Sequence, residues 1–287
     1  MKRKRFSLVD IIIAFILLLV VVMTAYPFLY MIAVSLSENI YVMKGEVTLW
    51  PKGFSTKMYE MVLQDPRIFT AYSNTFLYVI LGTVISLAVT AMGGYALARK
   101  EMLGNKQFTL LIVFTMFFQG GMIPTFLVVK GLSLVDTIWG MVLPSAVSTW
   151  NLIIMRTFFT SIPKELEEAG RMDGLNDIGI FARIVLPLSK AALATIGLFY
   201  AVAMWNNFYN ALLYLRSAEL FPLQVVLRNI VLAGQMNASE VSSSDSIIVE
   251  ESLKFATIIV STLPILLLYP FLQKYFVKGV MIGSVKG

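Results

Sequence analysis

The residues best placed to do chemistry lie in one polar segment, residues 163–189, and the chemistry they suit is protein docking. The segment reads PKELEEAGRMDGLNDIGIFARIVLPLS. Its first turn carries carboxylates that favour the positive end of a helix dipole: Glu165, Glu167 and Glu168. Gly174 then interrupts the helical pattern, and Asn176 or Asp177 can cap a second short helix. The apolar face expected for that helix comprises Ile178, Phe181, Ile184 and Val185. Two short helices with a glycine elbow predict a docking element for a soluble partner, here called the docking loop.

Six apolar stretches must position the docking loop. They are residues 11–34, 73–98, 108–129, 138–159, 191–215 and 255–276. At about 1.5 Å per residue, about 20 residues cross a hydrocarbon core of about 30 Å, so each stretch suits a transmembrane helix. Pro27 predicts a kink in the first stretch, and Gly120, Gly121 and Pro124 predict a bend in the third. We therefore predict an all-α membrane protein with six transmembrane helices.

The basic residues indicate how the chain lies in the bilayer. The first apolar stretch follows the sequence KRKR at residues 2–5 and is too long for a cleavable signal peptide, so we expect a retained helix. Residues 35–71 and 216–254 are then long external segments. Most of the 23 basic residues fall on the opposite side. The positive-inside rule places both termini and the docking loop in the cytoplasm.

The composition argues against catalysis by this chain. Its 287 residues include no cysteine and no histidine, which removes thiol and imidazole chemistry and leaves only carboxylates as metal ligands. With 58% hydrophobic and 14% charged residues, the chain falls in the membrane class. The formal charge of +6 does not indicate nucleic-acid binding, because the basic residues lie at the ends of apolar stretches.

The apolar stretches also lack a source of energy for transport. Ion-coupled carriers keep ionisable groups at membrane depth as their relay, and the cores of these stretches contain none. The sequence also lacks G-x-x-x-x-G-K-[ST], the cradle for nucleotide phosphates. If this chain moves a solute uphill, the work must come from another polypeptide, and the docking loop is the expected input.

The docking loop resembles a known motif. Its spacing is similar to the EAA loop of bacterial ABC import permeases, EAA-x3-G-x9-I-x-LP. The matching positions are Glu168, Ala169, Gly174, Ile184, Leu186 and Pro187. Asp173 strengthens the resemblance to the carbohydrate-uptake branch. Gly170 replaces the second alanine of the motif, which should loosen the first short helix by about 1 kcal/mol.

The resemblance implies a type I ABC importer permease fold in a bacterial plasma membrane. Residues 1–72 would form an N-terminal helix and external loop, and residues 73–287 the permease transmembrane domain. In such importers two homologous permeases form a heterodimer with two ATPase subunits, and an extracellular solute-binding protein delivers the solute. ATP and Mg bind the ATPase subunits, so the resemblance implies no cofactor in this chain and no nucleic-acid partner.

The resemblance also implies roles for residues of the docking loop. Glu168 would form ion pairs or cap a helix at the ATPase surface, although a solvated carboxylate on the helix face is the alternative. Gly174 would permit the turn. Residues that would anchor the second helix are Ile184, Leu186 and Pro187. Glu168→Lys or Gly174→Pro is then expected to uncouple transport from ATP hydrolysis.

The C-terminal tail is similar to that of maltose-type sugar permeases, in which it reaches the ATPase interface. The residues concerned are Lys278, Gly279, Gly283, Val285, Lys286 and Gly287. The alternative is a basic end near anionic lipid. Together with YPFLQKYF at 269–276, the tail resembles the branch that imports aldouronates or rhamnogalacturonan fragments.

Polar and aromatic residues inside the apolar stretches are candidates for the solute path, since sugars bind aromatic faces and amide groups. They are Trp205, Asn206, Asn207, Tyr209, Asn210, Gln119, Trp150 and Asn151. They could equally join neighbouring helices, and in the maltose relative the partner permease contacts the sugar. The outer segment 221–251 matches the place where relatives contact a solute-binding protein.

The sequence therefore favours an oligosaccharide importer permease, and two alternatives stay open. One is an ABC importer permease for a non-sugar solute, against which the C-terminal tail argues. The other is an ATP-independent polytopic membrane protein, such as a channel or an enzyme. Purification of the chain with or without an ATPase would separate the last alternative from the first two.

Overall fold

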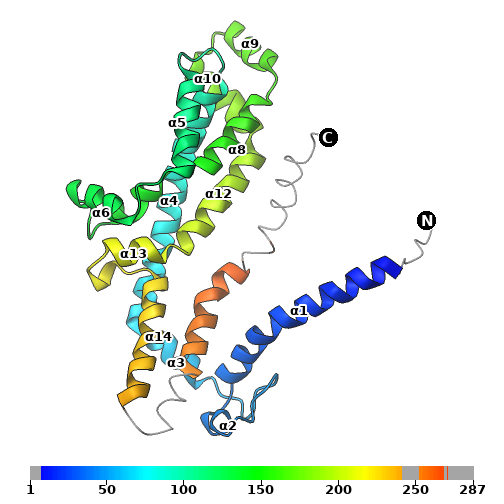
Figure 1. The fold of residues 1–287 in the computed structure, drawn as a ribbon, viewed down its shortest axis with the longest axis vertical. Helices are drawn as coiled ribbons and strands as arrows, with labels where there is room; N and C mark the ends of the chain where they lie inside the picture. The colour runs from blue at the N-terminus through cyan, green and yellow to red at the C-terminus, as the bar shows by residue number, and fades with distance from the viewer. Residues whose placement is uncertain (1–7, 241–251, 268–269, 271–287) are drawn as a thin grey trace. The chain divides into compact units, whose positions relative to one another are not determined.

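The computed structural model of the protein describes residues 8–240, 252–267 and 270, which form helices joined by turns (Figure 1). The chain divides into two compact units, Met1–Phe69 with Val226–Pro264, and Thr70–Val225 with Ile265–Gly287. No strand occurs in these described residues, where Ser37 and Phe54 form an isolated bridge. The predicted all-α class is confirmed.

The first unit contains the first apolar stretch and the outer segment that follows it. Its elements include α1 (Leu8–Ser35), α2 (Asn39–Met43), α3 (Lys57–Gln64), part of α14 (Leu223–Glu240) and most of the apolar helix Ser252–Leu267. Ala33 and Val34 are buried with Val47, and Tyr30 lies edge-on to Phe255 with ring centroids 6.3 Å apart. Most large side chains of α1 are exposed, as in a helix surrounded by lipid.

The second apolar helix, α4 (Pro66–Ala98), is longer than predicted. The sequence suggested that it begins at Ser73, but the helix starts seven residues earlier along the chain and has 33 residues. Proline suits the first helical position, and the Asp65 carboxylate accepts a hydrogen bond from Arg67 N at 2.9 Å. The helix therefore extends into the end of the segment predicted to be external, residues 35–71, because Asp65 and Pro66 begin it.

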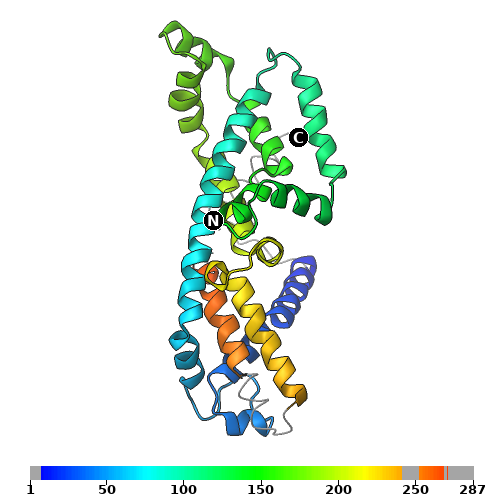
Figure 2. The same ribbon diagram turned by 90° about the vertical axis from the view of Figure 1, so that its left-hand side faces the viewer.

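The second unit is built along α4 (Figure 2). Its further elements in chain order are α5 (Asn105–Phe117), α6 (Met122–Gly131), α7 (Ile138–Val142), η1 (Leu143–Ser145), α8 (Thr149–Thr160), α9 (Lys164–Met172), α10 (Asp177–Ile180), η2 (Phe181–Val185), α11 (Leu186–Leu188), α12 (Lys190–Trp205), α13 (Phe208–Tyr214) and η3 (Ala218–Leu220). The helices α4, α8 and α12 share one buried core, to which Tyr95, Met155, Phe159, Ile196 and Tyr200 contribute. The docking loop therefore follows directly from a core helix and leads into another.

The number of apolar helices agrees with about six membrane spans. In the described part of the chain, α1 and α4 are each long and apolar enough to cross alone. Bent pairs supply further spans: α5 and α6 meet at 116°, and the chain bends by 55° before α8. The helix α12 belongs to a third bent pair, at 83° to the preceding segment. The apolar helix Ser252–Leu267 begins the sixth predicted stretch, whose end lies outside the described residues.

Three of the predicted spans are bent or broken, and in the third and the fifth the break lies at glycine or polar residues. The bend predicted in the third span is confirmed, since Gly121 has φ +82° between α5 and α6. The fifth predicted span, 191–215, is not one continuous helix, because α12 ends at Trp205 and α13 begins at Phe208. At this break the Asn207 side chain accepts a hydrogen bond from Asn210 N at 3.3 Å and so starts a new helix.

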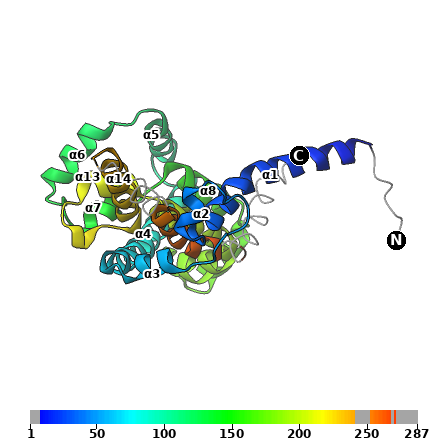
Figure 3. The same ribbon diagram turned by 90° about the horizontal axis from the view of Figure 1, so that it is seen from below.

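The elements around these breaks contact one another. Figure 3 shows α6, α7 and α13 gathered together, and α13 contacts both of the other helices. The Asn210 amide donates to Ser145 Oγ at 3.3 Å, and the Tyr209 hydroxyl donates to the sulfur of Met122 at 2.7 Å. Thr115 and Thr149 share a hydrogen bond at 3.2 Å. The breaks in the bundle are therefore joined by polar side chains.

Tyr200→Phe is expected to destabilise the second unit by about 1–3 kcal/mol, the usual cost of leaving buried polar groups without partners. The Tyr200 hydroxyl shares a hydrogen bond with Thr90 at 2.7 Å and accepts another from Ser148 N at 3.0 Å. Thermal unfolding in detergent measures the change. Tyr209→Phe is the control because the Tyr209 side chain is exposed, and equal melting temperatures for the two variants would contradict this role of Tyr200.

Candidate functional site

The first half of the docking loop folds as predicted. The helix α9 begins directly after Pro163, and its first turn carries Glu165 and Glu167. After α9, Gly174 adopts φ +81°, a left-handed conformation that side chains with a Cβ rarely take. Of the two caps considered for the second helix, Asn176 is the one used, and its side-chain oxygen accepts a hydrogen bond from Gly179 N at 2.8 Å. The glycine elbow is confirmed.

Three of the four residues predicted on the apolar face of the second half pack in or against the core: Phe181, Ile184 and Val185. Ile180 and Val185 are fully buried, whereas Ile178 is 76% exposed, so its assignment to the apolar face is wrong. Between α10 and α11 the segment η2 is a π-helix, with bonds five residues apart instead of four. This wider turn places Ile180 and Val185, five residues apart, on the same side and shifts the apolar face.

The glycine that departs from the motif lies at a close approach between the two halves. Gly170 is buried, and a Cβ added there would lie 2.6 Å from Cδ1 of Ile184 and 3.4 Å from Cγ1 of Ile180. Gly170 and Ile184, two of the motif positions, are thus brought into contact. Beyond a lower helix propensity, the glycine allows α9 to pack tightly against the segment that follows the elbow.

The other motif residues lie further from this contact. Leu186 is half-buried, and the remaining five are exposed: Glu168, Ala169, Asp173, Gly174 and Pro187. The exposed residues of α9 and the elbow therefore form a surface that no part of the described chain covers. The predicted residues of the tail, 278–287, lie outside the described residues.

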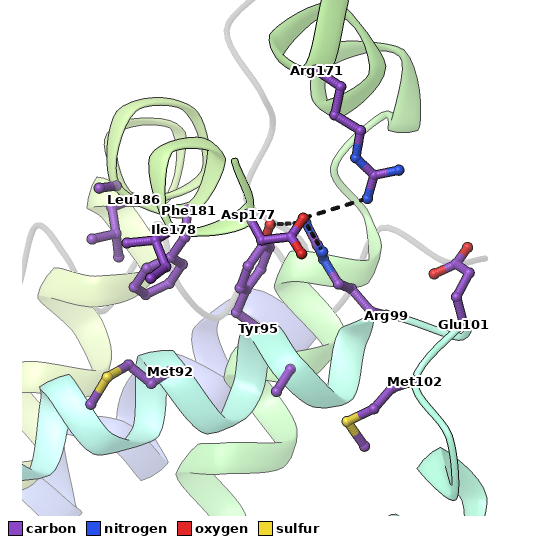
Figure 4. Close-up of a pocket in the computed structure, with 12 residues that line it drawn as sticks. Met92, Tyr95, Arg99, Glu101, Met102, Arg171, Asp177, Ile178, Phe181 and Leu186 are labelled. Carbon is purple, nitrogen blue, oxygen red and sulfur yellow. Dashed lines mark hydrogen bonds and ion pairs between the residues drawn. The ribbon is translucent and has the colours of Figure 1, made fainter. Parts of the chain in front are cut away.

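An arginine that the sequence did not single out holds the docking loop on α4. Arg99 Nη1 lies 2.6 Å from Asp177 Oδ1 on α10 (Figure 4). Its Nη2 lies 3.3 Å from Glu167 Oε2 on α9. Its guanidinium also donates to the Tyr95 hydroxyl and lies 4.6 Å from the centre of that ring. Arg99 directly follows the last residue of α4, and nothing local in the sequence indicates its partners.

Arg99 and Asp177 remain ionised near neutral pH. The hydrogen bond from Arg99 lowers the pKa of Asp177, and the fields of Arg99 and Arg171 act in the same direction. For Arg99, burial favours the neutral form, but contacts with Asp177, Tyr95 and Glu167 outweigh it and raise its pKa. Because the pKa of Asp177 is lowered on folding, the ion pair is complete above the ordinary carboxyl pKa of about 4 and is lost in more acidic solution.

A pocket of about 860 Å³ opens beside this ion-pair cluster (Figure 4). Its apolar wall includes Met92, Met102, Ile178, Phe181 and Leu186. Its charged rim includes Arg99, Glu101, Arg171 and Asp177. The wall joins the end of α4 to the second half of the docking loop.

The candidates for the solute path occupy several environments. Trp205 is buried and lies edge-on to Phe76, with ring centroids 5.6 Å apart. Asn207 caps α13. Asn151 is buried near the start of α8. The remaining candidates comprise the half-buried Asn210 and the exposed Asn206, Tyr209, Gln119 and Trp150. Tyr209 and Asn210 of α13 contact Met122 of α6 and Ser145 of η1, as described above. Trp150 and Asn151 lie on α8.

Comparison with known families gives one match that covers most of the site. Residues 92–282 match the family described as "Binding-protein-dependent transport system inner membrane component". This range contains the docking loop, Arg99 and all candidates for the solute path.

Individual proteins match over nearly the whole chain. The chain is 42% identical to the polygalacturonan/rhamnogalacturonan transport system permease protein YtcP of Bacillus subtilis (strain 168), over 100% of both chains. It is 42% identical to Protein LplC of the same organism, over 92% of this chain and 90% of that protein. A solved structure described as a bacterial ABC transporter involved in the import of the acidic polysaccharide alginate matches with TM-score 0.87 and 36% identity, covering 96% of this chain and 100% of the other.

Proposed function

This chain belongs to the family of binding-protein-dependent transport system inner membrane components, and we propose that it is the permease subunit of an ABC importer for uronate-containing oligosaccharides. The names of two similar proteins support this solute class, one referring to polygalacturonan and rhamnogalacturonan and the other to the acidic polysaccharide alginate. Both similarities extend over nearly the whole chain. The chain is a transport subunit, and ATP hydrolysis belongs to a separate subunit.

The observation that carries the proposal is the architecture of the docking loop. Two short helices meet at Gly174, and ion pairs from Arg99 hold both of them on α4. The opposite surface of α9 is exposed and includes Glu168. A segment anchored on one side and open on the other is suited to receive a soluble subunit, and its sequence matches the EAA pattern at seven of the eight positions considered.

The proposed mechanism transmits movement and needs no chemistry in this chain. ATP and Mg bind two ATPase subunits in the cytoplasm, whose closure moves the docking loop. Because α9 follows α8 and α11 leads into α12, movement of the loop is passed to two helices of the buried core. The bundle then alternates between inward-facing and outward-facing states. Differential contacts with the nucleotide-bound ATPase supply the free energy for this change.

The proposal includes two further partners, which the family and the predicted orientation support. A second, homologous permease completes the pathway as a heterodimer, and an extracellular solute-binding protein delivers the oligosaccharide. Both termini lie in the cytoplasm, in accordance with the basic residues at the N-terminus. The exposed apolar surface of α1 faces lipid or the second permease.

The solute path is proposed to pass the breaks in the transmembrane helices. Broken helices in transporters expose backbone and polar groups only where these line a cavity or pack against protein. Here the breaks after α5 and α12 carry Gln119 and Asn206, both exposed. Amide side chains at this depth can bind sugar hydroxyls. Trp205 supports the path from the core, since its ring packs on Phe76.

Transport by a reconstituted complex tests the proposed function. The chain is assembled with its homologous permease, the ATPase and the solute-binding protein in proteoliposomes, and uptake of labelled trigalacturonate is compared with that of neutral maltotriose. Accumulation of trigalacturonate that requires ATP and the binding protein is expected. Uptake of neither sugar would indicate another solute, and uptake without ATP would indicate an ATP-independent protein.

Glu168→Lys is expected to reduce ATP-driven uptake by about tenfold, because a reversed charge at a docking surface costs at least about 1.4 kcal/mol. The exposure of Glu168 means that the change leaves the fold of the docking loop intact. The measurement is uptake together with the amount of ATPase that copurifies. The control is Glu60→Lys on α3, an exposed glutamate in the outer segment. Equal uptake by both variants would show that Glu168 does not lie at the ATPase surface.

A further inference from the structure

Arg99 is the point at which both short helices of the docking loop meet α4. One carboxylate comes from α9 and one from α10, on opposite sides of the elbow at Gly174, and both contact the same guanidinium. We propose that Arg99 is a positioning residue for transport, which fastens α9 and α10 to α4 so that the three elements move as one body. This inference rests on the proposed function, and it adds a residue outside the EAA pattern.

Burial distinguishes this contact from an ordinary surface ion pair. The side chains of Arg99 and Glu167 are only 18% and 23% exposed, and this pair is the buried one, since the other partner, Asp177, is 65% exposed. By comparison, Lys164 and Glu101 also join α9 to the turn after α4, at 2.8 Å, but both are 70% exposed. Exposed pairs contribute little because water and salt screen them, whereas a partly buried arginine needs its carboxylates. The two pairs connect the same elements and therefore provide a matched comparison.

Aromatic rings extend the contact from Arg99 into the core. The guanidinium lies over Tyr95, which stacks on Phe181 of η2 with centroids 4.9 Å apart and an interplanar angle of 29°. Phe159 of α8 lies edge-on to both rings, at 6.2 Å and 6.5 Å. The same side chain thus joins charged groups at the surface to rings from α4, α8 and η2. If the docking loop moved relative to α4 and α8, these contacts would break.

The backbone that carries Arg99 is itself held in place. Arg156 of α8 donates to the carbonyl of Leu97 at 3.0 Å. Asn105 at the start of α5 donates to the carbonyls of Leu97 and Arg99, both at 2.9 Å. The last carbonyls of a helix lack partners within the helix, so these side chains fix the end of α4. Arg99 therefore projects from a fixed base towards the docking loop.

The geometry requires a guanidinium at this position. Arg99 contacts two carboxylates through different nitrogens while its plane lies near an aromatic ring. A lysine ammonium is a single point charge without this fork or stacking surface. Arg171 cannot replace Arg99, because it belongs to α9 itself. Its contact with Asp177, at 3.7 Å, joins α9 to α10 but not to α4. Arg99→Lys should hold one short helix and release the other.

Distances between spin labels test the linkage without any transport measurement. The chain has no cysteine, so labels can be attached to Leu103→Cys with Met172→Cys, and to Leu103→Cys with Ile178→Cys, all at exposed positions. In the assembled complex, each pair should give one narrow distance with and without ATP. Arg99→Gln should broaden both distributions by about twofold, because the released helices sample further positions.

Two further variants test whether the broadening is specific to Arg99 and to its guanidinium. Lys164→Gln should leave both distributions unchanged, and Arg99→Lys should broaden only one. Unchanged distributions in Arg99→Gln, or equal broadening in Lys164→Gln, would overturn the proposal. Because no sugar is present, these results do not depend on the identity of the solute.

The ratio of ATP hydrolysed to sugar imported separates positioning from folding. In proteoliposomes, Arg99→Gln should raise this ratio at least about fivefold, the lower end of typical coupling between sites. Arg99→Lys, which keeps one of the two ion pairs, should raise the ratio less than Arg99→Gln does. A lower yield of complex with an unchanged ratio would make Arg99 merely structural and overturn the proposal. If the unsubstituted complex imports no uronate sugar, the proposed function fails, while the spin-label distances still decide the role of Arg99.

Discussion

Gly174→Pro is expected to abolish ATP-driven uptake while the chain still inserts into the membrane. Gly174 has φ +81°, whereas proline is restricted to about −65°. The substitution also removes the hydrogen bond that Gly174 N donates to the carbonyl of Arg171 at 3.0 Å. Since both effects act on the elbow, α10 can no longer follow α9 in its present direction. The measurement is uptake at equal amounts of chain in the membrane.

Two further variants at this position separate backbone strain from side-chain size. No atom lies within 4 Å of a Cβ added at Gly174, so only the backbone conformation resists substitution. Asparagine tolerates the left-handed region better than other residues with a Cβ, and Gly174→Asn should retain most uptake. Gly174→Val should lose more, because a β-branched residue in this conformation costs about 1–2 kcal/mol or more.

Gly45 is a matched control for the elbow. It has φ +64°, no atom lies within 4 Å of its added Cβ, and its N–H donates to the carbonyl of Val42 at 3.0 Å. Gly45→Pro therefore introduces the same local strain in the predicted external segment. It should leave most of the uptake in place. Similar losses for Gly45→Pro and Gly174→Pro would attribute the effect to general destabilisation and refute a special role of the elbow.

Features of the docking loop with local causes could be predicted from the sequence. The start of α9 after Pro163, the elbow at Gly174 and the cap at Asn176 each depend on residues within one turn of the feature. The π-helix could not be predicted, because its wider turn brings Ile180 and Val185 together in the core shared with α4 and α8. Packing against distant residues decided the phase of this helix, and a periodicity of 3.6 residues placed Ile178 wrongly.

The ion-pair cluster could not be predicted from the sequence for a related reason. Glu167 is 68 residues from Arg99, and one carboxylate among several in the polar segment carries no local sign of its partner. The sequence favoured Glu168 because of its motif position, and the contacts within the chain are made by its neighbour. This division suits the proposed function, since Glu167 holds the loop on α4 while Glu168 remains exposed for a partner.

Helix breaks in the membrane were predictable only where glycine marks them. Gly121 predicted the turn between α5 and α6. At the end of α12, Asn206 and Asn207 resembled interior polar residues of an unbroken span, yet the Asn207 side chain caps a new helix. Asparagine can satisfy backbone groups within a helix end or bond to a neighbouring helix. Sequence alone does not decide between these two uses.

Gly170→Leu is expected to reduce ATP-driven uptake by about tenfold or more, because overpacking of a filled site costs about 1–3 kcal/mol. A Cβ at Gly170 already approaches Cδ1 of Ile184 to 2.6 Å, and a leucine places three further carbons in the same direction. The strain should push α9 away from η2 and disturb the surface that carries Glu168. Uptake and protease cleavage within the docking loop measure the displacement. Ala169→Leu is the control for protease cleavage only, since Ala169 is exposed on the same helix but belongs to the proposed ATPase surface.

Gly170→Ala tests the same contact, because it has two opposing effects of similar size on the stability of the docking loop. Alanine gains about 1 kcal/mol in helix propensity over glycine, but its Cβ requires the end of the Ile184 side chain to move. We expect little net change in uptake. Ile184→Val removes Cδ1, so Gly170→Ala combined with Ile184→Val should be more stable to protease than Ile184→Val alone. If Gly170→Ala by itself already protects the docking loop as much as the double variant, the close approach does not limit the packing of α9.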